Sequence, residues 1–240
     1  MKKLGLIHEG KSMKVYGTDD PERVVLEYKD DLTDNTGWRI GTVPGKGALN
    51  NSITNHLMRV LERNGIHTQY IEELTDRETL VRRAEMIPLE VIVRNVAAGR
   101  MAQRFGLQPG TSLRNTVLEY TFKSDELGDP EVNDQHILAM GWTDSATLKE
   151  IEREALKIND ILRRYMRSVD IELVDIKLEL GRDGQGRLML GDEISPDTCR
   201  FWDMRSQEKL DRDRVENTSI KDLPIIYERI AERLLEMDGR

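Results

Sequence analysis

The chain has little of what marks a secreted or membrane-bound protein. Its 240 residues contain one cysteine, Cys199, so an intramolecular disulfide is excluded and a reducing cytoplasm is the expected compartment. No apolar run approaches the roughly 18 residues that a membrane helix needs. The N-terminus becomes charged before a signal-peptide core could form. We therefore expect a cytoplasmic protein with no membrane partner.

Aromatic side chains and positive net charge are also scarce. Phe, Trp and Tyr make up 5% of the residues, which disfavours base stacking on single-stranded nucleic acid. The 44 acidic residues outnumber the 36 basic ones, so a general affinity for nucleic acid is not expected. The four histidines, at positions 8, 56, 67 and 136, lack metal-ligand spacing, which argues against a zinc site. A local basic pocket for a small phosphorylated ligand is compatible with this balance.

Hydrophobic patterning predicts an α+β fold. Strands are expected at residues 4–8, 14–17, 23–28, 69–74, 80–86, 89–96, 173–180 and 188–190. Helices are expected over residues 49–61, from a cap at 143–144 to residue 165, and from near residue 222, whereas the polar stretch 30–47 is expected to be a loop. Because strands and helices do not alternate regularly, a doubly wound parallel sheet is not expected. We place a β-rich lobe at residues 1–86 and a larger α+β lobe at residues 87–240.

A glycine-lysine turn, Gly10-Lys11, stands between two expected strands. Glycine lets backbone N–H groups approach a phosphate, and lysine adds a positive charge. The turn is not a Walker A loop, which needs G-x-x-x-x-G-K-[ST] followed by a helix. On this motif alone an ordinary exposed hairpin is the simpler interpretation, and a phosphate contact is the alternative.

The expected strand at 173–180 carries a charged face. Asp175, Lys177 and Glu179 alternate along it, so their side chains share one face, and Asp192 lies on the return arm of the same hairpin. Carboxylate oxygens suit Mg²⁺, and a lysine neutralises phosphate charge. The pattern therefore indicates either a metal and phosphate site or the solvated face of an amphipathic strand.

Charged residues also interrupt the apolar strand at 89–96. Glu90 and Arg94 fall on one face of it. A charge on a buried strand needs a partner or a ligand, so these two residues either pair with each other or meet a ligand. The segment 97–99, Ala-Ala-Gly, ends the strand where a substrate could approach the backbone closely.

A proline-broken loop at residues 195–203 holds Ser195, Asp197 and Arg200, and loops of this kind position binding groups. Nucleophilic catalysis is not expected from it. Neither Ser195 nor Cys199 has an adjacent histidine, and the G-x-S-x-G motif is absent.

In this order the motifs resemble the SAICAR synthetase family, the phosphoribosylaminoimidazole-succinocarboxamide synthetases of purine biosynthesis. The resemblance covers residues from about 5 to 214. The matching blocks are residues 9–11 with 15–16, 29–31 with 33, 45–47 with 50–51, 87–99, 123–125 with 129–130, 173–179, and 192–197 with 200 and 202–203. Each block alone is weak to moderate, but their collinear order is specific.

The resemblance implies an ATP- and Mg²⁺-dependent carbon–nitrogen ligase. In that family ATP phosphorylates the carboxylate of a carboxyaminoimidazole ribonucleotide, and the amine of L-aspartate then attacks the acyl phosphate. The implied fold is α+β, with an N-terminal nucleotide-binding lobe like that of kinases and ATP-grasp enzymes. The implied partners are these small molecules, with no nucleic acid and with a homodimer left open.

The resemblance also implies roles for individual residues. The implied catalytic residues are Lys11, Lys177 and Arg94. ATP would meet Lys11, Met86 at the hinge, Glu179 and Asp192, and the last two would hold Mg²⁺. The imidazole substrate would meet Arg94, Arg100, Lys177, Ser195, Asp197 and Arg200. Such a set places cations where two anionic reactants meet.

Three positions that the resemblance implies to face ligands depart from the family pattern: Met13 replaces a usual basic residue, Arg100 a usual serine and Glu216 a usual arginine. One alternative is therefore a diverged enzyme acting on another purine-related nucleotide, as in pentostatin- or coformycin-type antibiotic biosynthesis. A second alternative is a non-catalytic nucleotide-binding protein. The retention of Lys177, together with the two carboxylates implied to hold Mg²⁺, argues against the second.

Overall fold

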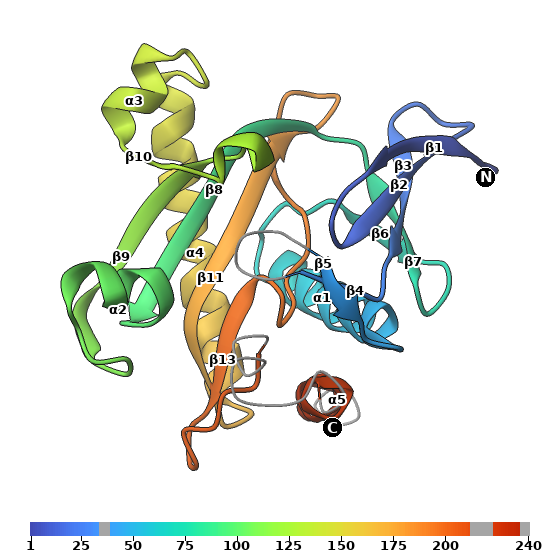
Figure 1. The fold of residues 1–240 in the computed structure, drawn as a ribbon. Helices are drawn as coiled ribbons and strands as arrows, with labels where there is room; N and C mark the ends of the chain where they lie inside the picture. The colour runs from blue at the N-terminus through green and yellow to red at the C-terminus, as the bar shows by residue number, and fades with distance from the viewer. Residues whose placement is uncertain (34–38, 212–222, 236–240) are drawn as a thin grey trace.

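The computed structural model describes residues 1–33, 39–211 and 223–235, in which two antiparallel sheets carry the fold (Figure 1). The first sheet has five strands in the order β1-β2-β3-β7-β6. Its strands are β1 (Lys3–Glu9), β2 (Met13–Thr18), β3 (Arg23–Tyr28), β6 (Tyr70–Glu73) and β7 (Glu78–Arg82). The glycine-lysine turn joins β1 to β2 and therefore lies at one edge of this sheet.

The second sheet has six strands, and its two longest lie in the middle. They are β8 (Glu85–Val96) and β11 (Ile171–Arg182). Around them lie β9 (Ser112–Phe122), β10 (Glu131–Val132), β12 (Leu188–Gly191) and β13 (Cys199–Asp203). β11 pairs with β8 along one side and with β13 and β12 along the other. A separate pair consists of β4 (Asp31–Thr33) and β5 (Arg39–Thr42).

Three long helices share the apolar core. They are α1 (Lys46–Arg63), α4 (Ser145–Arg167) and α5 (Leu223–Leu235). α4 packs on β8 and β11 of the second sheet, α1 packs on β3, β6 and β7 of the first sheet, and α5 packs on α1. Ile53, Ile158 and Ile230, one from each helix, are 0% exposed and share a single core with Ile176 and Leu178 of β11. Because neighbouring residues of a strand face opposite ways, this core turns the charged residues of β11 to the other face. Shorter elements are α2 (Gly99–Phe105), η1 (Asp125–Leu127) and α3 (Asp134–Ala139).

The α+β class expected from the sequence is confirmed, and each pairing between the named strands is antiparallel. The interpretation of residues 30–47 as a loop is wrong, because β4, β5 and the start of α1 lie in it. Asp30 explains the early start of α1. Its carboxylate accepts hydrogen bonds from the N–H groups of Gly45 (3.3 Å) and Gly47 (2.8 Å), which lie where the helix begins. The strand expected at 80–86 is divided between the end of β7 and the start of β8.

The expected cap of the long helix is confirmed, since the Asp144 carboxylate accepts a hydrogen bond from the Thr147 N–H at 2.7 Å. No element was expected between residues 97 and 142, where α2, β9, η1, β10 and α3 lie. The start of the last helix near residue 222 falls outside the described residues. Sheet membership changes between Arg82 and Glu85, and the division into lobes at 1–86 and 87–240 stays a prediction. None of the helices in the described part is long and apolar enough to cross a membrane.

Candidate functional site

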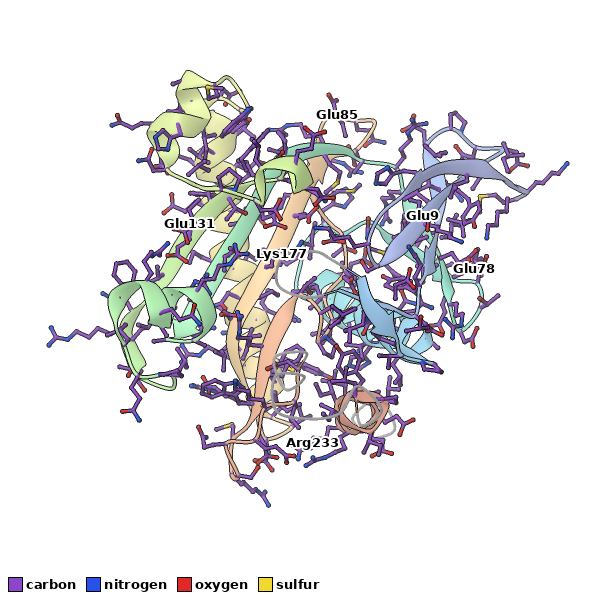
Figure 2. The ribbon with its side chains drawn as sticks, viewed as in Figure 1. Glu9, Glu78, Glu85, Glu131, Lys177 and Arg233 are labelled. Carbon is purple, nitrogen blue, oxygen red and sulfur yellow. The ribbon has the colours of Figure 1, made fainter. Side chains whose placement is uncertain are left out.

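The register between β8 and β11 assembles one charged face. Glu90 lies opposite Glu179, and Arg94 lies opposite Asp175, with Lys177 between them on β11. The alternate residues, such as Val91 and Leu178, face the core and are buried. The sequence alternation is therefore confirmed as a two-faced strand, apolar toward the helices and charged on the side that carries Lys177 (Figure 2).

Lys177 is the centre of this face. Its ammonium lies 2.6 Å from Glu179 Oε1, 3.1 Å from Glu90 Oε1 and 3.3 Å from Asp192 Oδ2. A second ammonium, that of Lys123 after β9, also donates to Glu179. Three carboxylates and two lysines thus meet at one place, and Glu179 is almost completely buried there.

The pKa values of the two carboxylates expected to hold a metal shift in opposite directions. Burial raises the pKa of Glu179, but Lys177 and Lys123 outweigh it and the net pKa falls. Burial and the neighbouring Glu179 carboxylate raise the pKa of Asp192. Burial lowers the pKa of Lys177, but Glu179, Asp192 and Glu90 outweigh it and raise its pKa well above the usual value. Lys177 is therefore a permanent cation at neutral pH.

A second cationic group lies further along β8 and β11. Arg94 Nη1 is 2.9 Å from Asp175 Oδ2, and its Nε donates to Glu119. Arg200 of β13 reaches both oxygens of Asp175, at 3.1 and 2.9 Å. The internal Glu90–Arg94 pair considered from the sequence is therefore not what the described residues show, since Arg94 pairs with Glu119 and Asp175, and Glu90 with Lys177.

The Ala-Ala-Gly segment after β8 leaves space for the guanidinium of Arg200. Gly99 has φ +51°, and a Cβ built there would lie 2.5 Å from Arg200 Nη2. A larger residue would both strain the backbone and collide with the guanidinium. In this structure the group close to this glycine is Arg200, and the expected approach of a substrate stays a prediction. The next residue, Arg100, is the second residue of α2 and is exposed.

The loop between β12 and β13 turns its polar groups onto one another. The Ser195 hydroxyl donates to Glu193 Oε2 at 2.7 Å and accepts from the Asp197 N–H at 3.0 Å. The Asp197 carboxylate accepts from Asn50 Nδ2 at 2.8 Å and from Lys46. Ser195 is 0% exposed. Both residues are therefore engaged with the protein itself in this structure.

Lys11 and Met86 lie at the edges of this arrangement. The Lys11 ammonium, in the β1–β2 turn, is 2.6 Å from Asp125 Oδ1 of η1, and both side chains are exposed. Met86, in β8, packs on Gly181 and Gly191, where a Cβ would lie within 3.0 Å of its thioether. Of the positions that depart from the family pattern, Met13 is half-buried in β2, and Glu216 lies outside the described residues.

Sequence reasoning assigned no role to three residues of this site, Lys46, Lys123 and Glu193. Lys46 is 1% exposed and donates to Asp197, while Lys123 donates to Glu179. Glu193 is also buried, beside Ser195 and Asn50. Each of the three residues belongs to a sequence block that carries the family resemblance. Membership of such a block was the sequence feature that could have identified them as site residues.

The donor set suits Mg²⁺. Glu179 and Asp192 offer carboxylate oxygens within reach of one ammonium, and the cluster holds more carboxylates than lysines. A hard cation that keeps waters and phosphate oxygens needs only one or two protein carboxylates. In the described part of the chain, no three His, Cys, Asp or Glu side chains are placed so that together they could hold a metal ion. A cage made of protein ligands alone is therefore not seen in that part.

Comparison with known proteins gives a consistent result. The SAICAR synthetase family model matches residues 6–233. A phosphoribosylaminoimidazole-succinocarboxamide synthase of Desulfitobacterium hafniense (strain DSM 10664 / DCB-2) is 50% identical over 232 residues, covering 97% of this chain and 95% of the relative. The structure of such a synthase from Ehrlichia chaffeensis has a TM-score of 0.92 and 39% identity, covering 96% of this chain and 98% of that one. A SAICAR synthetase solved in complex with ADP has a TM-score of 0.90 and 40% identity, covering 95% and 96%. The chain belongs to the SAICAR synthetase family.

Proposed function

We propose that this protein uses ATP to join the carboxylate of a carboxyaminoimidazole ribonucleotide to the amine of L-aspartate. The observation that carries the proposal is the single face on which Lys177 meets three carboxylates and Arg94 meets Arg200 through Asp175. A ligase of this kind must hold two anionic reactants together, and such a face supplies both cations and metal-binding oxygens. The family to which the chain belongs consists of ATP-dependent ligases of purine biosynthesis.

The chemistry has two steps. A carboxylate oxygen of the ribonucleotide attacks the γ-phosphorus of ATP, and ADP leaves. The aspartate amine then forms the carbon–nitrogen bond, inorganic phosphate leaves and the amine loses a proton. Lys177 and Lys11 are the cations we assign to the transferred phosphoryl group, because negative charge develops there during transfer. Met86, at the start of β8, is assigned to the hinge against adenine.

Glu179 and Asp192 are the residues we assign to Mg²⁺. When bound, the ion would neutralise phosphate oxygens and orient the phosphoryl group. Both carboxylates contact Lys177, and Glu179 also contacts Lys123. Support for nucleotide use comes from the relative that was solved with ADP.

The imidazole ribonucleotide is assigned to the arginine end of the face. Arg94 and Arg200 share Asp175, and Arg100 follows the glycine on which Arg200 lies. Guanidinium groups bind phosphate and carboxylate through paired hydrogen bonds. Ser195 and Asp197 stay predictions as substrate residues. The cytoplasmic location and the homodimer also stay predictions.

The two alternatives are less well supported. The 50% identity to a curated synthase over 97% of the chain favours the housekeeping reaction over a diverged substrate. A non-catalytic protein would not need the contacts that link Lys177 to three carboxylates.

The test is ADP release by the purified protein with ATP, Mg²⁺, the carboxyaminoimidazole ribonucleotide and L-aspartate. We expect kcat/KM for the ribonucleotide at or above about 10⁴ M⁻¹s⁻¹, and formation of the succinocarboxamide only when aspartate is present. Turnover restricted to another nucleotide carboxylate would support the diverged enzyme. Nucleotide binding without turnover of any carboxylate would support the non-catalytic protein.

A further inference from the structure

The loop between β12 and β13, residues 192–198, is tied to the site at both of its ends. At its start Asp192 lies 3.3 Å from the Lys177 ammonium. Near its end the Thr198 carbonyl accepts a hydrogen bond from the Lys177 N–H at 2.9 Å, and Arg200 follows two residues later. A shift of this loop would therefore move Arg200 relative to Asp175 and Lys177.

Asp197 is the point at which the loop is held from the other side. Its Oδ1 accepts a hydrogen bond from the Tyr227 hydroxyl at 2.7 Å, and its Oδ2 accepts from Asn50 at 2.8 Å and from Lys46. Lys46 and Tyr227 are 1% and 0% exposed. Hydrogen bonds to a carboxylate in such a dry place are stronger than those at a surface.

Tyr227 brings the C-terminal helix into this contact. It lies on α5, whose apolar residues share the core with α1, α4 and the second sheet. A phenylalanine would fill the same space in that core. The hydroxyl is therefore the part of the side chain that is needed to hydrogen-bond Asp197. The hydroxyl therefore links a helix outside the charged face to the loop that carries Asp192 and leads to Arg200.

We propose that Tyr227 is a positioning residue, which holds the loop 192–198 through Asp197 so that Arg200 stays beside Asp175 and Lys177. The kinetic part of this inference rests on the proposed function. The structural part concerns only the loop and can be tested without any substrate.

Cys199 supplies the structural test, because it is the single cysteine of the chain and directly follows the loop. Its thiol is buried in the shared core at the start of β13, with the residue 4% exposed, so an aromatic disulfide reagent can reach it only when the structure around the end of the loop opens. In Tyr227→Phe we expect the rate of Cys199 modification to rise at least about tenfold, because a hydrogen bond to a charged group is lost from the closed state. Modification is followed by the release of one reagent thiolate per chain, at a temperature where both proteins are folded by circular dichroism.

Tyr165→Phe is the matched control. The Tyr165 hydroxyl also reaches α5, at the Leu234 carbonyl (3.4 Å), and contacts His56, but it does not contact the loop 192–198 in the described residues. We expect its rate of Cys199 modification to stay within about twofold of the unmodified protein. Equal acceleration in the two variants, or none in Tyr227→Phe, would overturn the proposal.

The kinetic test separates positioning from general damage. Tyr227→Phe should lower kcat/KM for the ribonucleotide about tenfold. The Kd for metal-free ADP should stay within twofold of the unmodified protein, because Lys11 and Met86, which we assign to the nucleotide itself, lie outside the loop 192–198. Parallel losses in both quantities, or unchanged kcat/KM, would refute the positioning role. If the unmodified protein does not turn over the ribonucleotide, the proposed function fails, and the modification rates of Cys199 still decide whether Tyr227 holds the loop.

Discussion

Lys177 is the residue whose surroundings say most about the chemistry. It is held between Glu90, Glu179 and Asp192, which keep it charged. Lys177→Met removes that charge and keeps much of the side chain's apolar bulk. We expect kcat to fall by about 10²-fold or more, because the variant lacks a cation beside the negative charge that develops on the transferred phosphoryl group. The rate of ADP release at saturating substrate measures this kcat.

Lys157→Met is the control for this prediction, since Lys157 is exposed on α4 and its hydrogen bond among the described residues is to the Gly65 carbonyl. A Lys177→Met protein with the turnover of this control would contradict the assignment of Lys177 to phosphoryl transfer.

Glu179 tests the assignment of the metal without any turnover. Glu179→Gln keeps the shape of the side chain and removes its charge, so Mg²⁺ loses an anionic ligand. We expect the enhancement of ADP affinity by Mg²⁺ to shrink at least about tenfold, as measured by calorimetry with and without the ion. Glu73→Gln, at an exposed position of β6, should keep the full enhancement. An undiminished Mg²⁺ effect in Glu179→Gln would exclude this carboxylate as a ligand.

At the scale of elements, a buried amide pair joins α4 to β8. Asn95 Nδ2 donates to Asn159 Oδ1 at 2.8 Å, Asn159 Nδ2 donates to Asn95 Oδ1 at 3.0 Å, and both residues are nearly unexposed. Asn159→Ala leaves the Asn95 amide without this partner. We expect the free energy of unfolding to fall by about 1–3 kcal/mol in urea denaturation. Asn115→Ala, at an exposed position of β9, should change it little, and equal losses in the two variants would contradict the role of the pair.

The turn after β13 makes stability depend on pH. The N–H of Ser206 and the guanidinium of Arg233 on α5 hold the pKa of Asp203 well below its usual value. A lowered carboxyl pKa stabilises the fold above the pKa of the unfolded chain, about 3.9, and this stabilisation is lost as the pH falls toward the folded pKa. Asp203→Asn should therefore be less stable than the unmodified protein at pH 7, and the difference should narrow below about pH 4. Urea midpoints from pH 7 to pH 3 test this, and a constant difference would contradict it.

At the scale of the whole molecule, an exposed ion pair joins the β1–β2 turn of the first sheet to η1, which follows β9 of the second sheet. The pair consists of the Lys11 ammonium and the Asp125 carboxylate. If Lys11 meets phosphate, it must leave Asp125. We expect Lys11→Ala to lower turnover about 10²-fold. Asp125→Asn should tighten ADP binding by up to about fivefold, because an exposed pair is worth at most about 1 kcal/mol. Weaker ADP binding in Asp125→Asn would mean that the pair supports the bound state.

Local patterns in the sequence were enough for the parts of the site that lie on one strand or turn. The alternation of Asp175, Lys177 and Glu179 predicted their shared face, and the cap at Asp144 predicted the start of α4. Both are properties of a few neighbouring residues. Strand alternation depends on the two-residue period of the backbone, and helix capping depends on the first turn of the helix. The collinear motifs added the family, since their order along the chain does not depend on the fold.

Which charged side chains meet depends on the tertiary fold. Lys177 and Glu90 are separated by 87 positions, and Lys123 and Glu179 by 56, so their contacts depend on the strand order that places β8 beside β11 and β9 on the far side of β8. Because of the same strand order, Arg94 pairs with Asp175 and Glu119 and not with Glu90. The packing of α5 places the Tyr227 hydroxyl within hydrogen-bond distance of Asp197. Local sequence patterns are sufficient to predict which side chains share a strand face and which family the chain resembles. Register and helix packing determined their partners, because hydrogen bonds and ion pairs act over a few ångströms and chain closure alone brings distant residues within that range.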